Sequence, residues 1–139
     1  MKLVTVRGGF HVDSFGAMAV CDPINGMQQL FQDVIPHHIF APKVSCGFYE
    51  SWDESYATQF ADLVRCHHEE IAAVILEPVV QGAGGMYFYN PQFLTAVRKL
   101  CDQYNILLIL DEIATGFGRT GELFGANHAH ICPDIMCLG

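Results

Sequence analysis

Two uninterrupted apolar runs in the second half of the chain flank a stretch in which apolar residues recur with helical spacing. The runs cover residues 72–76 and 106–110, and their lack of polar side chains is typical of strands buried on both faces of a parallel sheet. The stretch between them predicts a helix that begins at Asn90-Pro91 and turns Arg98 to solvent. Strand, helix and strand in this order predict a right-handed βαβ unit with parallel strands.

The rest of the chain gives weaker signals of the same kind, without internal repeats or a linker rich in serine, glycine and proline. The predicted elements are a strand over Leu3–Arg7 that stops at Gly8-Gly9, a short helix over His11–Val20, loops and short extended pieces over Asn25–Tyr49, an amphipathic helix over Glu54–Glu70, and a last strand over Ile135–Leu138. Together they predict one continuous unit of the α/β class, with a mostly parallel sheet and flanking helices.

Composition changes this picture in one respect. Of the 139 residues, 51% are hydrophobic and only 16% are charged, whereas globular proteins carry about 25% charged residues. A domain this small has a large share of surface and therefore needs many charged residues. We therefore expect the chain to be an internal part of a larger domain.

Charge and hydropathy exclude several classes of function. The formal net charge of −8 repels nucleic-acid phosphates and anionic lipids, so we expect no nucleic-acid binding. The apolar runs are far shorter than the ~20 residues of a membrane span, so we expect no membrane segment. Residues 1–7 lack the apolar core of a leader peptide, which favours a cytoplasmic protein. The clustered histidines lack the spacing of zinc ligands, and we expect no metal site.

Candidate chemistry gathers where the predicted strands end. Asp111 directly follows the second apolar run, and ligands of open α/β sheets bind beyond the carboxyl ends of strands. Asp111 is either a strand terminus that reaches water or a carboxylate that fixes a ligand nitrogen. The run Gly82–Gly85 is either a phosphate cradle or a mobile or tight loop, and a loop is favoured because the spacing fails the dinucleotide fingerprint. The run Gly116–Gly121 fits that fingerprint, but no amphipathic helix follows it.

Four sequence strings together resemble a known family. They are Asp-Glu-Ile-Ala-Thr-Gly-Phe-Gly-Arg-Thr-Gly at 111–121, Glu-Pro-Val-Val-Gln-Gly-Ala-Gly-Gly-Met at 77–86, Phe-His-Val-Asp-Ser-Phe-Gly-Ala-Met at 10–18, and Cys-Asp-Pro at 21–23. On these residues the chain resembles the class III aminotransferases, which depend on pyridoxal 5'-phosphate, over essentially its whole length. The resemblance implies the large cofactor domain of a fold type I transferase.

The resemblance also assigns cofactor-binding residues. Asp111 matches the aspartate that pairs with the pyridine nitrogen of the cofactor, and Ile113 matches the aliphatic side chain on one face of the ring. Phe10 matches the aromatic residue on the other face, where tyrosine is usual, and His11 follows it as in the family. Val12 replaces the usual glycine, a change that allows a different geometry at this turn.

The substrates implied by the resemblance are small molecules. The strings at 80–86 and 21–23 favour the branch that moves an amino group from S-adenosylmethionine to 8-amino-7-oxononanoate in biotin biosynthesis. Phe10, Asp13 and Arg119 match positions near the substrate pocket of that branch. Glu77 matches a glutamate below the cofactor with a structural or charge-network role.

Several parts of such an enzyme are expected outside the 139 residues. The lysine that binds the cofactor would follow Gly139, and Lys2, Lys43 and Lys99 occupy none of the expected positions. The upstream loop for the cofactor phosphate and the C-terminal small domain are also missing, so residues 1–139 are expected to be a partial, inactive cofactor domain. When complete, the protein is expected to be a homodimer.

Two other hypotheses stay open. The chain could belong to another class III aminotransferase, of the ornithine or ω-amino acid type, which a screen of amino donors would distinguish. Alternatively, it is a truncated, non-catalytic gene product, which would have to fold cooperatively on its own.

Overall fold

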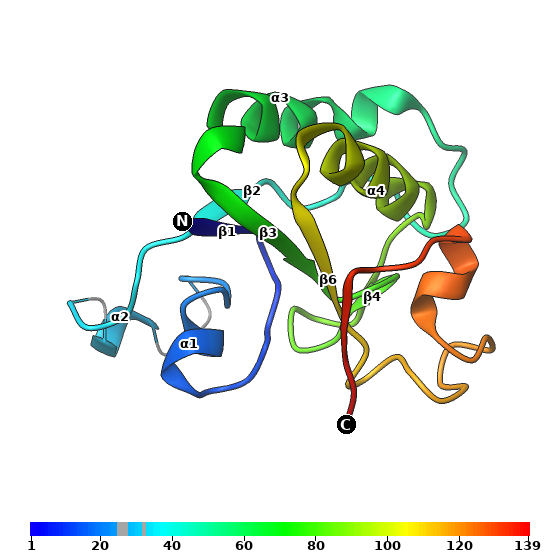
Figure 1. Cartoon of the computed structure of the whole chain (residues 1–139). Helices are drawn as coiled ribbons and strands as arrows, with labels where there is room; N and C mark the ends of the chain where they lie inside the picture. The colour runs from blue at the N-terminus through cyan, green and yellow to red at the C-terminus, as the bar shows by residue number, and fades with distance from the viewer. Residues whose placement is uncertain (25–27, 32) are drawn as a thin grey trace.

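Five parallel strands form the central sheet of the computed structural model, which describes residues 1–24, 28–31 and 33–139 (Figure 1). Along the sheet the order is β2-β1-β3-β6-β7. The strands are β1 (Lys2–Val6), β2 (Ile39–Ala41), β3 (Ile71–Leu76), β6 (Leu107–Asp111) and β7 (Ile135–Cys137), and a separate antiparallel pair consists of β4 (Val80–Gln81) and β5 (Tyr87–Phe88). The predicted α/β class with a mostly parallel sheet is therefore confirmed.

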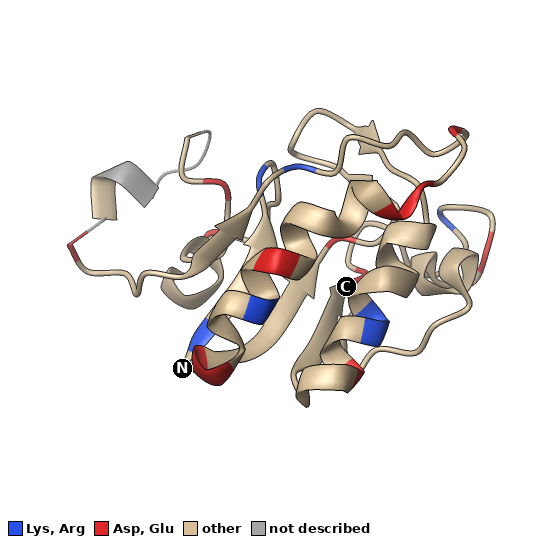
Figure 2. Ribbon diagram, turned by 90° about the horizontal axis from the view of Figure 1, so that it is seen from above, with Lys and Arg blue, Asp and Glu red and all other residues tan. Residues whose placement is uncertain are grey.

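The two longer helices lie on the same face of this sheet (Figures 1 and 2). The helices are α1 (Phe15–Met18), α2 (Gln28–Phe31), α3 (Thr58–His67) and α4 (Gln92–Tyr104), with 3-10 turns η1 (Glu54–Ala57), η2 (His68–Glu70) and η3 (Gly125–Ala129). Phe60 and Phe93 meet edge to face between α3 and α4, and each buried side chain of this size stabilises the fold by roughly 1.5–3 kcal/mol. None of the helices in the described ranges is long and apolar enough to cross a bilayer.

Helix α4 has the boundaries that its sequence indicates. The Asn90 side chain accepts a hydrogen bond from the Gln92 amide at 2.9 Å, which satisfies one of the free N–H groups at the helix start. Asn105 ends the helix in the left-handed region with φ 54°, a conformation that asparagine tolerates. Arg98, however, does not face solvent as predicted, because it pairs with Asp134 at 2.8 Å and its side chain is only 15% exposed.

The βαβ unit β3-α4-β6 is parallel, as predicted. Leu76 is opposite Leu110 in the register, so Glu77 and Asp111 follow at the same edge of the sheet. We call this the carboxyl edge. It is the place where ligands of such sheets bind.

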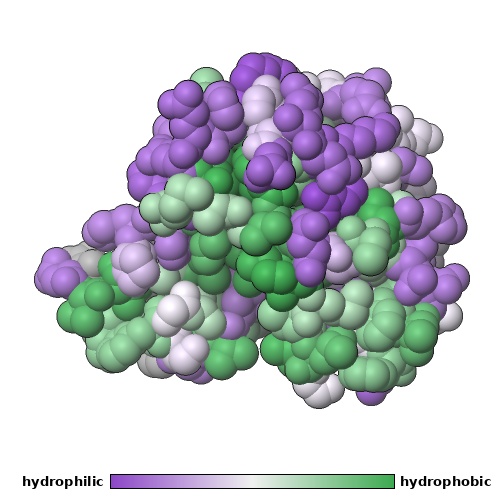
Figure 3. All heavy atoms as spheres, viewed as in Figure 1, coloured by the Kyte–Doolittle hydropathy of each residue, from purple (hydrophilic) through white to green (hydrophobic). Residues whose placement is uncertain are grey.

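The sheet is covered unequally on its two faces, so the prediction that both strands are buried on both faces is only partly correct. Leu108 and Leu110 are fully buried, whereas Leu107 and Ile135 are 47% and 46% exposed. Alternate side chains of a strand point to opposite faces, so the second face of β6 and β7 stays open. Hydrophobic residues also gather on the lower part of the surface in Figure 3, below the hydrophilic helices.

Two predicted segments differ from the structure or lie partly outside it. The helix predicted over His11–Val20 is wrong except for α1, because Val12 has φ 85° and cannot continue a right-handed helix. Within Asn25–Tyr49, β2 matches the expected short extended pieces and α2 was not predicted. Residues 25–27 and 32 lie outside the described residues.

Candidate functional site

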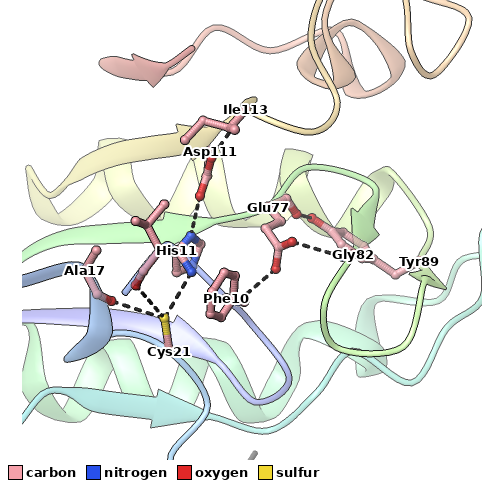
Figure 4. A network of polar contacts seen from close by, with 10 residues as sticks. Phe10, His11, Ala17, Cys21, Glu77, Gly82, Tyr89, Asp111 and Ile113 are labelled. Atoms are coloured by element: carbon pink, nitrogen blue, oxygen red, sulfur yellow. Dashed lines mark hydrogen bonds and ion pairs between the residues drawn. The ribbon is translucent and has the colours of Figure 1, made fainter. Parts of the chain in front are cut away.

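A buried pair of ionisable side chains marks the carboxyl edge. The Nδ1 atom of His11 lies 2.7 Å from Oδ2 of Asp111, and their side chains are 1% and 8% exposed. Figure 4 shows His11, from the segment after β1, reaching Asp111 at the end of β6. The second carboxylate oxygen accepts a hydrogen bond from the Ile113 amide at 3.2 Å. Among the described residues, no lysine or arginine pairs with Asp111.

The Asp111 carboxylate borders a cavity of about 230 Å³. Phe10 and Ile113 also line it and are 37% and 48% exposed, which leaves their apolar surfaces free for a ligand. The full lining consists of Phe10, Val12, Glu77, Gly82, Ala83, Asp111, Ile113, Ala114 and Thr115. A carboxylate without a Lys or Arg partner, next to exposed aromatic and aliphatic side chains, suits a flat aromatic ligand with a protonated nitrogen.

Glu77 connects two of the loops around this cavity. Its Oε2 atom accepts a hydrogen bond from the Phe10 amide at 3.1 Å, and its Oε1 atom accepts one from the Gly82 amide at 3.0 Å (Figure 4). Burial raises the pKa of the Glu77 carboxyl above its ordinary value, although both N–H groups act in the opposite direction. The arrangement agrees with the structural role that the sequence suggested.

The turn that carries His11 is strained at the next residue. Val12 has φ 85°, a region that β-branched residues rarely adopt. The Cys21 thiol lies beside this turn, where Sγ accepts a hydrogen bond from the His11 amide at 3.1 Å and lies 3.6 Å from the Val12 carbonyl oxygen. Burial raises the pKa of the Cys21 thiol. A positive φ is the conformation for which glycine is suited, so the turn at Val12 has a glycine-like geometry despite its valine.

The run Gly82–Gly85 forms a tight loop, one of the two forms that the favoured alternative, a mobile or tight loop, allowed. The Gly85 and Met86 amides both donate to the Gly82 carbonyl oxygen, and this turn joins β4 to β5. A Cβ atom on Gly84 would lie 2.1 Å from the Gly8 carbonyl oxygen, so only glycine allows this approach of two backbones.

The side chain of Glu112, the neighbour of Asp111, stabilises the surrounding loops and does not line the cavity. It is fully buried and accepts hydrogen bonds from the Thr115 hydroxyl and from the Gly125 and Ala126 amides, at 2.5, 2.9 and 2.9 Å. These bonds fix the loop after β6 to the start of η3. The Glu112 side chain is not part of the cavity lining.

Two predicted substrate residues are not brought to the cavity. Asp13 and Arg119 are exposed and are not part of its lining. The glycines at 116–121 lie in turns, and no α-helix follows them before β7. Among the described residues, no three His, Cys, Asp or Glu side chains converge on a common metal position.

Comparison with known proteins shows which family the chain belongs to. The family described as aminotransferase class-III matches residues 1–139. The chain belongs to this family. The adenosylmethionine-8-amino-7-oxononanoate aminotransferases of Mycobacterium leprae and Saccharomyces cerevisiae are 49% and 43% identical to it, over 99% of the chain in each case. This class III chain spans about a third of the length of these relatives, 31% and 34%.

Solved structures agree with this assignment. A crystal structure of adenosylmethionine-8-amino-7-oxononanoate aminotransferase from Methanocaldococcus jannaschii has a TM-score of 0.85 at 33% identity. An ω-transaminase from Pseudomonas jessenii in complex with PMP has a TM-score of 0.84 at 26% identity. Each similarity covers 99% of this chain and 31% or 32% of the solved chain. The class III chain therefore has the fold of the corresponding part of these transaminases.

Proposed function

We propose that the chain is part of a class III aminotransferase that moves an amino group from S-adenosylmethionine to 8-amino-7-oxononanoate, giving 7,8-diaminononanoate in biotin biosynthesis. The observation that carries the proposal is the buried pair of His11 and Asp111, 2.7 Å apart, beside a cavity lined by Phe10 and Ile113. The names of the curated relatives support the substrates.

The residues of the cavity fit pyridoxal 5'-phosphate as the cofactor. Asp111 would face the pyridine nitrogen and favour its protonated state, because the carboxylate is desolvated and has no Lys or Arg partner in the part of the chain that the structure describes. His11 keeps the carboxylate in place, and the apolar side chains of Phe10 and Ile113 would pack against the ring. When bound, the cofactor supplies an electron sink for the carbanion formed at the amine-bearing carbon.

The substrate assignments of Phe10, Asp13 and Arg119 remain part of the proposal. Phe10 has no hydroxyl, so it can contribute apolar contact but no hydrogen bond to a substrate. Asp13 and Arg119 are exposed, and we propose that they reach the substrate only in the complete protein. Small molecules are then the ligands of the site.

We further propose that the lysine for the cofactor follows Gly139 and that the loop for its phosphate and the small domain lie outside residues 1–139. The length of the relatives and the open apolar face of β6 and β7 support this organisation. Lys2 pairs with Glu70 at 3.1 Å and Lys43 lies 3.9 Å from the ring centroid of Tyr87, so neither is available at the cavity. Lys99 is exposed on α4. We also propose that the complete protein is a homodimer in the cytoplasm.

The alternative is an aminotransferase of the ornithine or ω-amino acid type. The similarity to the Pseudomonas jessenii ω-transaminase favours it, although at a lower identity than the relatives named for S-adenosylmethionine. A truncated, non-catalytic product is the third possibility.

The test uses the complete gene product that carries this chain, supplied with pyridoxal 5'-phosphate and 8-amino-7-oxononanoate. Mass spectrometry follows the formation of 7,8-diaminononanoate with S-adenosylmethionine, ornithine or an ω-amino acid as donor. We expect turnover with S-adenosylmethionine only. Asp111→Asn should reduce kcat at least about 100-fold, since a charge that stabilises the reacting system is removed. Asp62→Asn changes an exposed carboxylate on α3 and serves as the matched control.

Preference for another donor would replace the proposal by the alternative. No turnover with any donor would favour the non-catalytic product.

A further inference from the structure

One residue of the cavity wall has a backbone conformation that does not suit its side chain. Val12 has φ 85°, in a region that glycine adopts freely and β-branched residues rarely adopt. Strain of this kind persists only where the surroundings impose it, and it is concentrated at ligand sites. Two features of Val12 therefore need an explanation: the bend of its backbone and the presence of an isopropyl group at that bend.

Contacts on both sides of Val12 account for the bend. The His11 amide donates to Sγ of Cys21 at 3.1 Å, and Nδ1 of His11 lies 2.7 Å from Oδ2 of Asp111. The Cys21 thiol also lies 3.6 Å from the Val12 carbonyl oxygen. These contacts fix the backbone at the turn, and glycine would adopt the same conformation without strain. The bend therefore does not explain the valine.

The isopropyl group adds little to the core but lines the cavity. Val12 is 47% exposed, whereas Val79, the other valine with positive φ among the described residues, is 1% exposed. Burial stabilises in proportion to the apolar area removed from water, so packing offsets the strain at Val79 far more than at Val12. The cavity of about 230 Å³ is lined by Val12 together with Phe10, Asp111 and Ile113. The side chain of Val12 is thus part of the wall that a ligand would meet.

We propose that Val12 is a specificity-determining residue that limits the size of the ligand beside the Asp111 carboxylate. The inference rests on the proposed function, in which Asp111 faces the pyridine nitrogen and Phe10 packs against the ring. Val12 is two residues after Phe10 and shares the cavity wall with Asp111. Its side chain then meets the edge of the ring that carries the nitrogen. The carbons next to this nitrogen are C2, with a methyl group, and C6, with a hydrogen atom, and Val12 excludes larger substituents there.

The test measures binding of cofactor analogues to the complete protein freed of cofactor, by titration followed through absorbance. One analogue of pyridoxal 5'-phosphate carries an ethyl group in place of the methyl group on C2, and the other carries a methyl group on C6. We expect the unmodified protein to bind at least one of them about tenfold or more weakly than pyridoxal 5'-phosphate, the effect of one extra carbon in a filled apolar site. In Val12→Gly this difference should fall below about threefold, because the space beside Asp111 is enlarged.

Three further variants separate the size of the side chain from the strain of the backbone. Val12→Ala keeps a Cβ atom at the positive φ but removes two methyl groups, so it should reduce the discrimination nearly as much as Val12→Gly. Val12→Thr keeps the branched shape of the side chain and should keep the discrimination. Val79→Ala removes the same two methyl groups from a valine outside the cavity lining, and it should also keep the discrimination when measured below its Tm.

An unmodified protein that binds both analogues as tightly as pyridoxal 5'-phosphate would overturn the proposal, and so would equal discrimination in the unmodified protein and in Val12→Gly. Discrimination that is lost in Val12→Gly but kept in Val12→Ala would assign the effect to the backbone, which also contradicts a role of side-chain size. A complete protein that binds no pyridoxal 5'-phosphate would overturn the proposed function and this inference with it. The other outcomes concern Val12 alone and leave the proposed function intact.

Discussion

The helix-covered face of the sheet and its carboxyl edge differ in how their backbones are built. Among the described residues of the covered face, the non-glycine residues with positive φ are Asn105 and His130, and both end helical segments where this conformation is ordinary. The described loops of the carboxyl edge contain four others, namely Val12, Val79, Met86 and Phe117. Strain of this kind costs of order 1–3 kcal/mol per residue and persists only where the surroundings impose it.

This difference separates stability from function within one small chain. Fully buried side chains such as Leu94 and Leu108 provide the free energy of folding, and they pack as any core does. At the edge, apolar side chains such as Ile113 stay exposed, and a carboxylate such as Asp111 is buried. The core therefore offsets the cost of an edge whose residues we propose bind a ligand.

The largest expected contrast is between two aliphatic side chains near opposite ends of β6. Leu108→Ala empties a fully buried position, so it should lower the free energy of unfolding by about 2–5 kcal/mol. Ile113→Ala removes a side chain that is 48% exposed, and it should cost less than about 1.5 kcal/mol. Urea unfolding of the complete protein measures both.

Affinity for pyridoxal 5'-phosphate, measured by titration, should show the reverse order. Ile113→Ala should weaken binding, and Leu108→Ala should leave it nearly unchanged at a temperature where that variant is folded. Equal losses of stability in the two variants would remove the distinction between the helix-covered face and the carboxyl edge.

The helix-covered part of the sheet could be predicted from the sequence because its hydrophobic patterns agree with its tertiary structure. The apolar runs at 72–76 and 106–110, with the helix between them, gave the parallel βαβ unit and thus the shared edge of Glu77 and Asp111. Arg98 was misjudged because its partner Asp134 is distant in sequence and lies beside it only after β7 has joined the sheet.

The edge could be predicted only in part. Asp111 was identified by its place after an apolar run, but its pairing with His11 joins residues far apart in the chain and no periodicity indicates it. The helix predicted over 11–20 failed because the conformation of Val12 contradicts its own preference.

Val12 and Val79 permit a matched test of the strain at the edge. Both are valines with positive φ, 85° and 57°, but Val12 is 47% exposed and Val79 is 1% exposed. Val12→Gly should raise stability by about 1 kcal/mol, because relief of strain exceeds the added entropy of the unfolded chain. Val79→Gly should lower it, because the lost burial outweighs the same relief.

Differential scanning calorimetry of the two variants shows, through the shift of Tm, whether each substitution raises or lowers stability. A lower Tm for Val12→Gly would mean that the turn carries no strain. A higher Tm for Val79→Gly would mean that strain, and not packing, dominates this part of the edge.

The smallest expected effect concerns Asp134, which directly precedes β7 and lies on the helix-covered side of the sheet. Its Oδ2 atom accepts hydrogen bonds from the Leu108 amide at 2.7 Å and from Arg98 at 2.8 Å. These donors, the Leu108 amide first, hold the pKa of the Asp134 carboxyl below its usual value. The folded state therefore favours the carboxylate.

A carboxyl whose pKa is lower in the folded than in the unfolded chain stabilises the fold at pH values above its pKa in the unfolded chain, about 3.9. That contribution is lost as the pH falls through the folded pKa. Asp134→Asn should thus cost up to about 1 kcal/mol near neutral pH, and this difference from the unmodified protein should shrink in acid. Urea unfolding at a series of pH values measures it, with Asp62→Asn as the control for net charge on an exposed pair. A difference that stays constant into acid would assign the effect to packing of β7 and not to the charge that joins it to α4.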